Sequence, residues 1–156
     1  MHQIRRAVLN DVPEITACIK DAYTPYIQRI GKAPAPMLED YVEVVTQKNI
    51  WVLEGLGSEL LGVLVLVPET EYLLIENIAI KSRYQGRGFG GKLMDFAESE
   101  ALKLGYKVMR LYTNVKMVEN QVIYEHLGWK NIGLVSEEGY DRVYMEKRIL
   151  VSVSYL

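Results

Sequence analysis

The chain has 156 residues, of which 49% are hydrophobic and 24% are charged, a composition typical of a globular protein with a sizeable core. A formal net charge of −2 gives no electrostatic reason to expect nucleic acid as a partner, and a single cysteine excludes an internal disulfide and a cysteine-rich metal site. No segment reaches the roughly 18 consecutive apolar residues of a membrane helix, and the N-terminus lacks the apolar core of a signal peptide.

These properties predict a cytoplasmic protein with no metal and no membrane association. We expect one domain over residues 1–150 and a tail at residues 151–156.

The first element is a strand at residues 4–8. A helix follows, which Asn10 or Asp11 can cap and which has Pro13 in its first turn.

The next segment predicts a second helix and an antiparallel meander. Residues 23–36 contain three prolines and a glycine and are expected to be irregular. A helix is expected from Met37 onward. Its apolar stripe would comprise Leu38, Tyr41, Val42 and Val45. Strands with short turns between them are expected at residues 50–54, 60–67 and 72–80.

The second half of the chain begins with a long amphipathic helix from Phe89 to about Leu104, which Gly105 ends. Its apolar face would comprise Leu93, Met94, Ala97, Ala101 and Leu104. A strand, a helix and two strands are then expected at residues 107–113, 118–127, 129–135 and 142–149. The order β-α-α-β-β-β-α-β-α-β-β predicts a mixed α/β (α+β) fold with a mostly antiparallel central sheet flanked by helices. One parallel pair is expected where the long helix connects two strands.

A glycine-rich segment directly before the long helix carries the clearest functional signal. It reads Gln85-Gly86-Arg87-Gly88-Phe89-Gly90, followed by Gly91 and Lys92. Glycines let the backbone approach an anion closely, and the N–H groups at a helix start point toward it. The segment therefore predicts a ligand that carries phosphate.

Two nucleotide patterns compete for this segment. Gly86-x-Gly88-x-x-Gly91 fits a dinucleotide loop, but that loop needs an acidic residue about 20 positions later, and residues 109–114 contain none. The spacing from Gly86 to Gly91-Lys92 resembles a triphosphate loop, but Leu93 replaces the hydroxyl residue that would hold Mg²⁺. A nucleotide-binding module stays a weaker alternative.

A third pattern fits better. Gln85-x-x-Gly88-x-Gly90 after a strand that ends Ile78-Ala79-Ile80 resembles the acetyl-CoA motif of the GNAT-type N-acetyltransferases. The opening residues 4–7, the order of elements and the segment from Tyr124 to Gly128-Trp129 are also similar to that family. Many members carry an asparagine seven residues before this tyrosine. Here that position is Met117, and Asn120 lies about one helical turn later.

The resemblance implies a GNAT fold and transfer of an acetyl group from acetyl-CoA to a primary amine by direct attack in a ternary complex. In the family, backbone N–H groups of the loop hold the CoA pyrophosphate, and the pantetheine arm pairs with the preceding strand. The cofactor residues implied are Ile78, Ala79, Ile80, Gln85, Gly86, Arg87, Gly88, Phe89, Gly90, Gly91, Lys92, Asn120 and Tyr124.

The implied chemistry needs a base and an acid. A lysine-like amine, with a pKa of about 10.4, arrives protonated, so a base has to remove its proton. Glu76 is the candidate because strand alternation puts it on the same face as Leu74 and Ile78, and apolar neighbours favour proton uptake by a carboxylate. Glu71, Tyr72 or a chain of waters are alternatives. Tyr124 matches the family's general acid, which protonates the CoA thiolate.

The acceptor site is expected from the segment between the first two helices and from the last hairpin. An apolar and aromatic wall would comprise Tyr23, Tyr26, Ile27, Ile30, Met37 and Tyr41. Glu39 and Asp40, with Glu76, would attract a cation. The acceptor is a small-molecule amine or a protein amine. A non-catalytic acyl-CoA sensor on the same fold is the alternative function, and a homodimer would pair through Val143, Met145, Ile149, Val151 and Val153.

Overall fold

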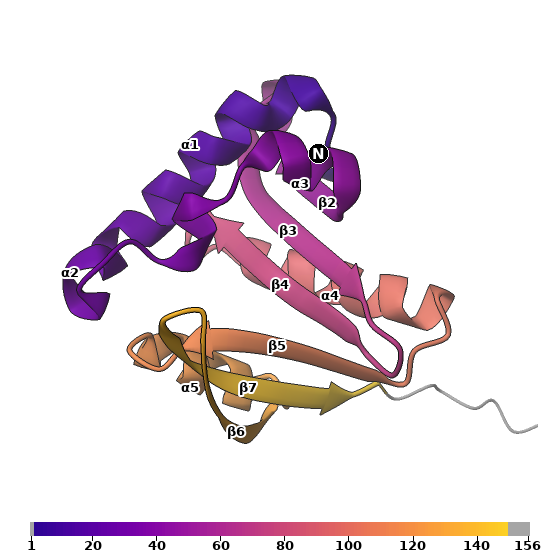
Figure 1. The fold of residues 1–156 in the computed structure, drawn as a ribbon. Coiled ribbons are helices and arrows are strands. Elements are labelled where there is room, and N and C mark those ends of the chain that lie inside the picture. Colours follow the sequence, from indigo (N-terminus) through magenta and orange to yellow (C-terminus); the bar gives the residue numbers. More distant parts are fainter. Residues whose placement is uncertain (1, 150–156) are drawn as a thin grey trace, which may run out of the picture. The chain divides into compact units, whose positions relative to one another are not determined.

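The computed structural model describes residues 2–149, which form two compact units. Unit 1 holds residues 2–67 and 76–96, and unit 2 holds residues 68–75 and 97–149. The described residues contain a sheet of seven strands in the order β1-β2-β3-β4-β5-β7-β6. The pairs β1–β2, β2–β3, β5–β7 and β6–β7 are antiparallel, and β4–β5 is parallel. The predicted mixed, mostly antiparallel sheet is confirmed (Figure 1). That residues 1–150 are a single domain stays a prediction.

Unit 1 contains the N-terminal strands, the first helices and the start of the long helix. Its strands are β1 (Gln3–Arg6), β2 (Asn49–Glu54), β3 (Leu60–Pro68, of which Pro68 belongs to unit 2) and the second half of β4 (Leu73–Ile80). Its helices are α1 (Val12–Tyr23), α2 (Ile27–Ile30), α3 (Tyr41–Gln47) and the first half of α4 (Phe89–Lys103). Short 3-10 turns join several of them.

The core of unit 1 lies on both faces of β3, which explains why this strand is almost uniformly apolar. One face packs with α1 and α3 through residues such as Val63, Ile19 and Val44, which are at most 3% exposed. On the other face, a Cβ at Gly62 would lie 2.6 Å from Ile80 Cδ1 and 3.3 Å from Leu93 Cδ1 of α4. The same Cβ would lie 2.9 Å from the Ala79 carbonyl oxygen, which is backbone and cannot move aside, so glycine is required where β3 runs beside the end of β4.

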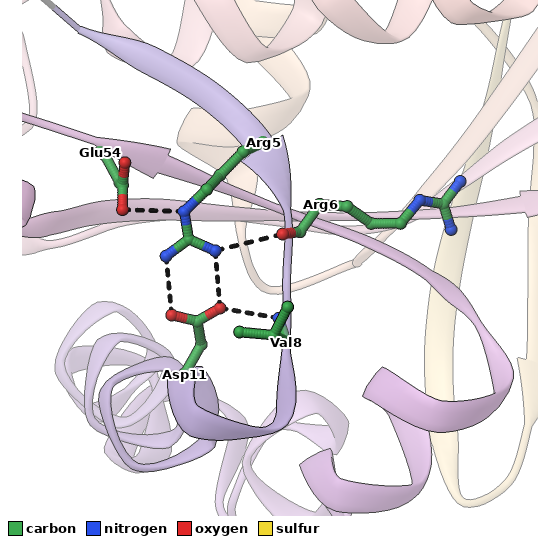
Figure 2. Close-up of polar contacts among 5 residues, drawn as sticks. All are labelled: Arg5, Arg6, Val8, Asp11 and Glu54. Atoms are coloured by element: carbon green, nitrogen blue, oxygen red, sulfur yellow. Dashed lines mark hydrogen bonds and ion pairs between the residues drawn. The ribbon is translucent and has the colours of Figure 1, made fainter.

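The start of α1 differs from the sequence prediction. Asp11 precedes the helix, but its side chain does not cap it. Instead, both carboxylate oxygens accept hydrogen bonds of 2.8 Å from the Arg5 guanidinium, and one also accepts the Val8 N–H (Figure 2). Arg5 Nε donates to Glu54 on β2 at 2.8 Å. This cluster connects β1, β2 and the start of α1.

The predicted second helix also needs correction. Residues 24–38 are not irregular throughout, because they form 3-10 turns at Thr24–Tyr26 and Ala35–Leu38 and the single-turn helix α2. The helix itself begins only at Tyr41, where the Asp40 carboxylate accepts the Val42 N–H. The shorter helix changes the buried face: Tyr41 and Val44 are buried, whereas Leu38 and Val42 are exposed.

Unit 2 contains the second half of α4 and the strands β5 (Val108–Asn114), β6 (Lys130–Glu137) and β7 (Tyr140–Arg148), with helix α5 (Val118–His126). The predicted parallel pair is confirmed: Leu73, Leu74 and Ile75 of β4 pair with Met109, Arg110 and Leu111 of β5. Ala97 and Ala101 of α4 are buried as predicted, but Leu104 is 55% exposed because α4 ends one residue earlier.

The C-terminal strand does not suit the predicted dimer contact. β7 pairs with β5 along one edge and with β6 along the other, so neither edge is available to a second copy. Val143, Met145 and Ile149 are buried within the chain, and residues 151–156 lie outside the described residues. A homodimer stays a prediction, but β7 cannot provide its contact.

Within residues 2–149, no helix combines the length and the apolar character that crossing a membrane requires. The cytoplasmic location stays a prediction.

Candidate active site

The glycine-rich segment links the end of β4 to the start of α4, as predicted. Gly86 and Gly88 have φ values of +78° and +86°, in the left-handed region that side chains disfavour. The first helical hydrogen bond of α4 runs from the Lys92 N–H to the Gly88 carbonyl, at 3.1 Å. The N–H groups of Phe89, Gly90 and Gly91 therefore precede the hydrogen-bonded ladder of the helix and are available to an anion.

The space beside this loop fits a bulky anion. No heavy atom lies within 4 Å of the position that a Cβ would take at Gly86, Gly88, Gly90 or Gly91. A ligand can thus approach the backbone at each of these glycines. Arg87 and Lys92 are exposed, and the Arg87 guanidinium lies 5.7 Å from the Tyr84 ring centre.

Several predicted cofactor residues have structural partners of their own. Gln85 Nε2 donates to the Ile80 carbonyl at 3.0 Å, so this side chain holds the loop to the end of β4. Ala79 and Ile80 are 5% and 9% exposed, which leaves only their backbone to a ligand. The Phe89 ring packs against His2 and Tyr84, with ring centres 4.8 and 6.3 Å apart.

A second contact holds the turn directly before the loop. Ser82, in the 3-10 turn at Ser82–Tyr84, donates its N–H to Asp21 Oδ2 at 2.6 Å and its hydroxyl to Asp21 Oδ1 at 3.1 Å. Asp21 lies near the end of α1. Sequence reasoning missed this contact because 61 residues separate the two partners.

Glu76 lies on the half-buried face of β4 with Leu74 and Ile78, as strand alternation predicts. It is not surrounded by apolar side chains alone. Lys48 Nζ, directly after α3, donates to Glu76 Oε1 at 2.6 Å, and the two side chains are 35% and 20% exposed. The expected apolar environment is therefore wrong, and Lys48 is a site residue that sequence reasoning missed.

Asn77, the next residue of β4, is also new to the site. It is 7% exposed, its Oδ1 accepts from the Tyr23 hydroxyl at 2.7 Å, and its amide lies 3.5 Å from the Tyr41 hydroxyl. Tyr41 in turn donates to the Pro36 carbonyl at 2.6 Å. Burial raises the pKa of the Tyr41 hydroxyl above its ordinary value, so it stays protonated. This network connects the ends of α1 and α3 to β4.

The residues of the predicted acceptor wall fall into two groups, one in or against the core and one on the α2 segment. Tyr41 is 4% exposed and belongs to the core, while Tyr23 and Met37 are partly buried and pack against that core. Tyr26 and Ile30 are half-buried on the α2 segment, and the Arg29 guanidinium lies 5.2 Å from the Tyr26 ring centre.

In unit 2, Tyr124 lies on α5 and is half-buried. Its ring contacts the buried Trp129 edge-on, with 6.4 Å between ring centres, and its carbonyl accepts the Trp129 N–H at 3.0 Å. This contact explains why the tyrosine and the aromatic residue occur together. Asn120 lies one turn before Tyr124 on the same helix and is half-buried.

Among residues 2–149, no three His, Cys, Asp or Glu side chains come together as a metal site would require.

Comparison with known proteins gives this arrangement a family. The sequence profile of the acetyltransferase (GNAT) domain matches residues 46–131, which is more than half of the chain. The chain belongs to the GNAT acetyltransferase family. The match includes β4, the glycine loop, Tyr124 and Trp129, while the opening residues 4–7 lie outside it.

Individual GNAT relatives agree with this result. The uncharacterized N-acetyltransferase YjgM of Escherichia coli is 28% identical over 138 residues, which cover 83% of this chain and 82% of the relative. A GNAT-family acetyltransferase structure from Desulfovibrio desulfuricans matches with a TM-score of 0.78 at 14% identity, covering 96% of this chain and 100% of the other. One from Elizabethkingia anophelis, solved with acetyl-CoA bound, has a TM-score of 0.69 at 17% identity and covers 94% and 97%. The GNAT fold predicted from the sequence is confirmed.

Proposed function

We propose that this GNAT acetyltransferase transfers the acetyl group of acetyl-CoA to a primary amine by direct attack in a ternary complex. The observation that carries the proposal is the open glycine loop, in which Gly86 and Gly88 take left-handed backbone conformations and the α4 start offers unpaired N–H groups. A CoA pyrophosphate suits such a loop. The acetyl-CoA bound to the Elizabethkingia anophelis relative supports the same cofactor.

The loop residues would bind and orient the cofactor. The N–H groups of residues 86–91 would hold the pyrophosphate, with Arg87 and Lys92 adding positive charge. The backbone N–H of Ile78 would polarise the thioester carbonyl as an oxyanion donor. Bound acetyl-CoA supplies an activated acetyl group with a thiolate as its leaving group.

Glu76 is the proposed base. Its side chain lies on the half-buried face of β4, and it is two residues before Ile78, which carries the proposed oxyanion donor. There it would take the proton of the acceptor's ammonium group, leaving the neutral amine that can attack a carbonyl.

Tyr124 is the proposed acid, since its phenol can return a proton to the departing sulfur. Asn120, on the same helix, is proposed as a further cofactor contact. The acceptor contacts are proposed to come from Tyr23, Tyr26, Ile30 and Met37. Tyr41 is left out, because it is buried and its hydroxyl is already bonded to Pro36.

The test measures turnover of a broad panel of amines with acetyl-CoA. For the best acceptor, Glu76→Gln and Tyr124→Phe should each lower kcat by about a hundredfold, the usual worth of a general acid or base, while acetyl-CoA affinity stays within about twofold. Tyr106→Phe is the matched control, because the Tyr106 hydroxyl donates to the Glu69 carbonyl outside the proposed site.

Two results would contradict the proposal. Tight acetyl-CoA binding without turnover of any amine would favour a sensor. Calorimetry that finds tighter binding of NAD or Mg-ATP than of acetyl-CoA would favour a nucleotide-binding module.

A further inference from the structure

The ion pair between Lys48 and Glu76 connects two segments that lie 28 residues apart. Lys48 follows the last turn of α3, and its N–H is the last to bond into that helix, to the Val44 carbonyl at 2.9 Å. The start of the helix is fixed as well, by the Asp40 cap and by the buried Tyr41. The Lys48 side chain therefore extends from a well-held backbone to Glu76 Oε1, 2.6 Å away.

Charged groups around Lys48 keep its ammonium protonated. Partial burial lowers the pKa of Lys48, but the hydrogen bond to Glu76 and the charges of Glu76, Glu39 and Glu43 outweigh burial, so that the pKa lies above its ordinary value. The remaining titratable group near Glu76 is the Tyr41 hydroxyl, whose pKa is raised chiefly by burial and further by the charges of Glu39 and Glu76. Lys48 is thus the positive charge that faces Glu76.

The ammonium also restricts the conformation of the carboxylate. A charge-assisted hydrogen bond is directional, so an ammonium at 2.6 Å limits the rotamers that the Glu76 side chain can adopt. Without the ammonium, this restriction would be lost.

We propose that Lys48 is a positioning residue for the base: its ammonium holds the Glu76 carboxylate in the orientation that meets the acceptor's proton. The inference rests on the proposed function, in which Glu76 receives the acceptor's proton. Lys48 itself contacts no reacting atom. Its role is to restrict the carboxylate to one orientation, and the loss of Lys48 would leave the base poorly aligned with the acceptor.

The experiment measures kcat and KM with the best acceptor. In Lys48→Met, kcat should fall by about tenfold while the KM for acetyl-CoA stays within about twofold, because the carboxylate is present but no longer held in place. Lys48→Arg, which keeps the cation, should keep kcat within about threefold of the wild type. Lys103→Met is the matched control, because Lys103 forms an ion pair with Glu100 and not with Glu76.

A double-mutant cycle with Glu76→Gln is the second measurement. If Lys48 acts through Glu76, Lys48→Met should lower kcat no further in the Glu76→Gln background. A Lys48→Met variant that is folded and less stable, but keeps its kcat, would overturn the inference and leave Lys48 a purely structural residue.

The two proposals fail in different ways. If Glu76→Gln keeps its rate, Glu76 is not the base, whatever the rate of Lys48→Met. If Glu76→Gln loses the rate but Lys48→Met keeps it, the proposed function stands and the inference about Lys48 is wrong.

Discussion

The glycine loop and the Glu76–Asn77 stretch of β4 lie within ten residues of each other in the chain, yet they are built by different means. The loop is exposed, and its chemistry comes from main-chain N–H groups that the turn and the helix start leave unpaired. Glu76 and Asn77 are half-buried and buried, and side chains from α1 and from α3 and its C-terminal end satisfy them.

This difference predicts which substitutions disturb a site built from backbone groups and which disturb a site built from side chains. A loop that uses its backbone depends on conformation and on the absence of side chains, and its neighbours matter little. A site that uses side chains depends on partners far away in the sequence, so that a distant substitution can disturb it. The following predictions test this contrast, from the largest expected effect to the smallest.

The largest effect is expected at the loop backbone. Gly88→Val places a β-branched residue at a φ of +86° and fills the open space beside the backbone, so acetyl-CoA affinity should fall by about a hundredfold in calorimetry. Gly31→Val is the control, because Gly31 has a φ of +90° and similar open space but caps α2. An equal loss of affinity in both variants would attribute the effect to general destabilisation.

The second effect is expected at Asn77. Asn77→Ala leaves the Tyr23 hydroxyl without its acceptor, so the free energy of unfolding measured in urea should drop by about 2 kcal/mol. A double-mutant cycle with Tyr23→Phe should show that the two changes are not additive. Asn131→Ala, which removes an exposed hydrogen bond to the Gly133 N–H, should change stability by less than about 0.5 kcal/mol. Additive losses for Asn77 and Tyr23 would contradict the network.

The third effect concerns pH and the Arg5 cluster. The hydrogen bonds from Arg5 lower the pKa of Asp11 below its ordinary value of 3.8. Because the folded-state pKa is the lower one, the stabilisation is complete above pH 3.8 and is lost as the pH falls through the folded-state pKa. We expect Asp11→Asn to cost about 1 kcal/mol in urea unfolding at pH 7, after allowance for solvent screening, and this difference should shrink toward pH 3. A difference that is constant with pH would exclude this linkage.

The smallest effect is expected at Asp21, which holds the turn before the loop through Ser82. Asp21→Ala should weaken acetyl-CoA binding by about threefold, because the turn loses two hydrogen bonds while the loop backbone keeps its own conformation. Glu14→Ala, an exposed change on the same helix, should have no effect on binding. A loss as large as that of Gly88→Val would mean that the loop depends on distant side chains after all.

Sequence reasoning succeeded where a signal is local. The strands, α4 and α5 were predicted within one or two residues, because apolar periodicity and glycine stops lie in the segments themselves. It failed between residues 24 and 41, where three prolines suggested an irregular loop and the start of the helix depends on a cap by Asp40 rather than on the apolar pattern. It also offered Asn10 or Asp11 as the cap of α1, whereas the Asp11 carboxylate accepts from Arg5 and from the Val8 N–H and not from α1.

The same division holds for the candidate site. The loop motif, the Gln85 signature and the pairing of Tyr124 with Trp129 are readable because the residues of each lie within a few positions of one another. Lys48, Asn77 and Asp21 carry no such pattern, and a lysine 28 residues before a glutamate predicts no contact. The motif predicts Gln85 as a cofactor residue. Its second role, holding the loop to the end of β4, is visible only from its hydrogen bond to the Ile80 carbonyl.

The amino-acid sequence by itself determined the order of the elements, the glycine loop and the family resemblance, because backbone conformation and amphipathic patterns depend on near neighbours. Only the tertiary structure decided which groups face the proposed base and which tyrosines are buried in the core. The physical reason is that a half-buried charge or polar group has to be satisfied by whatever the fold brings beside it, and for Glu76 and Asn77 that is Lys48 and Tyr23.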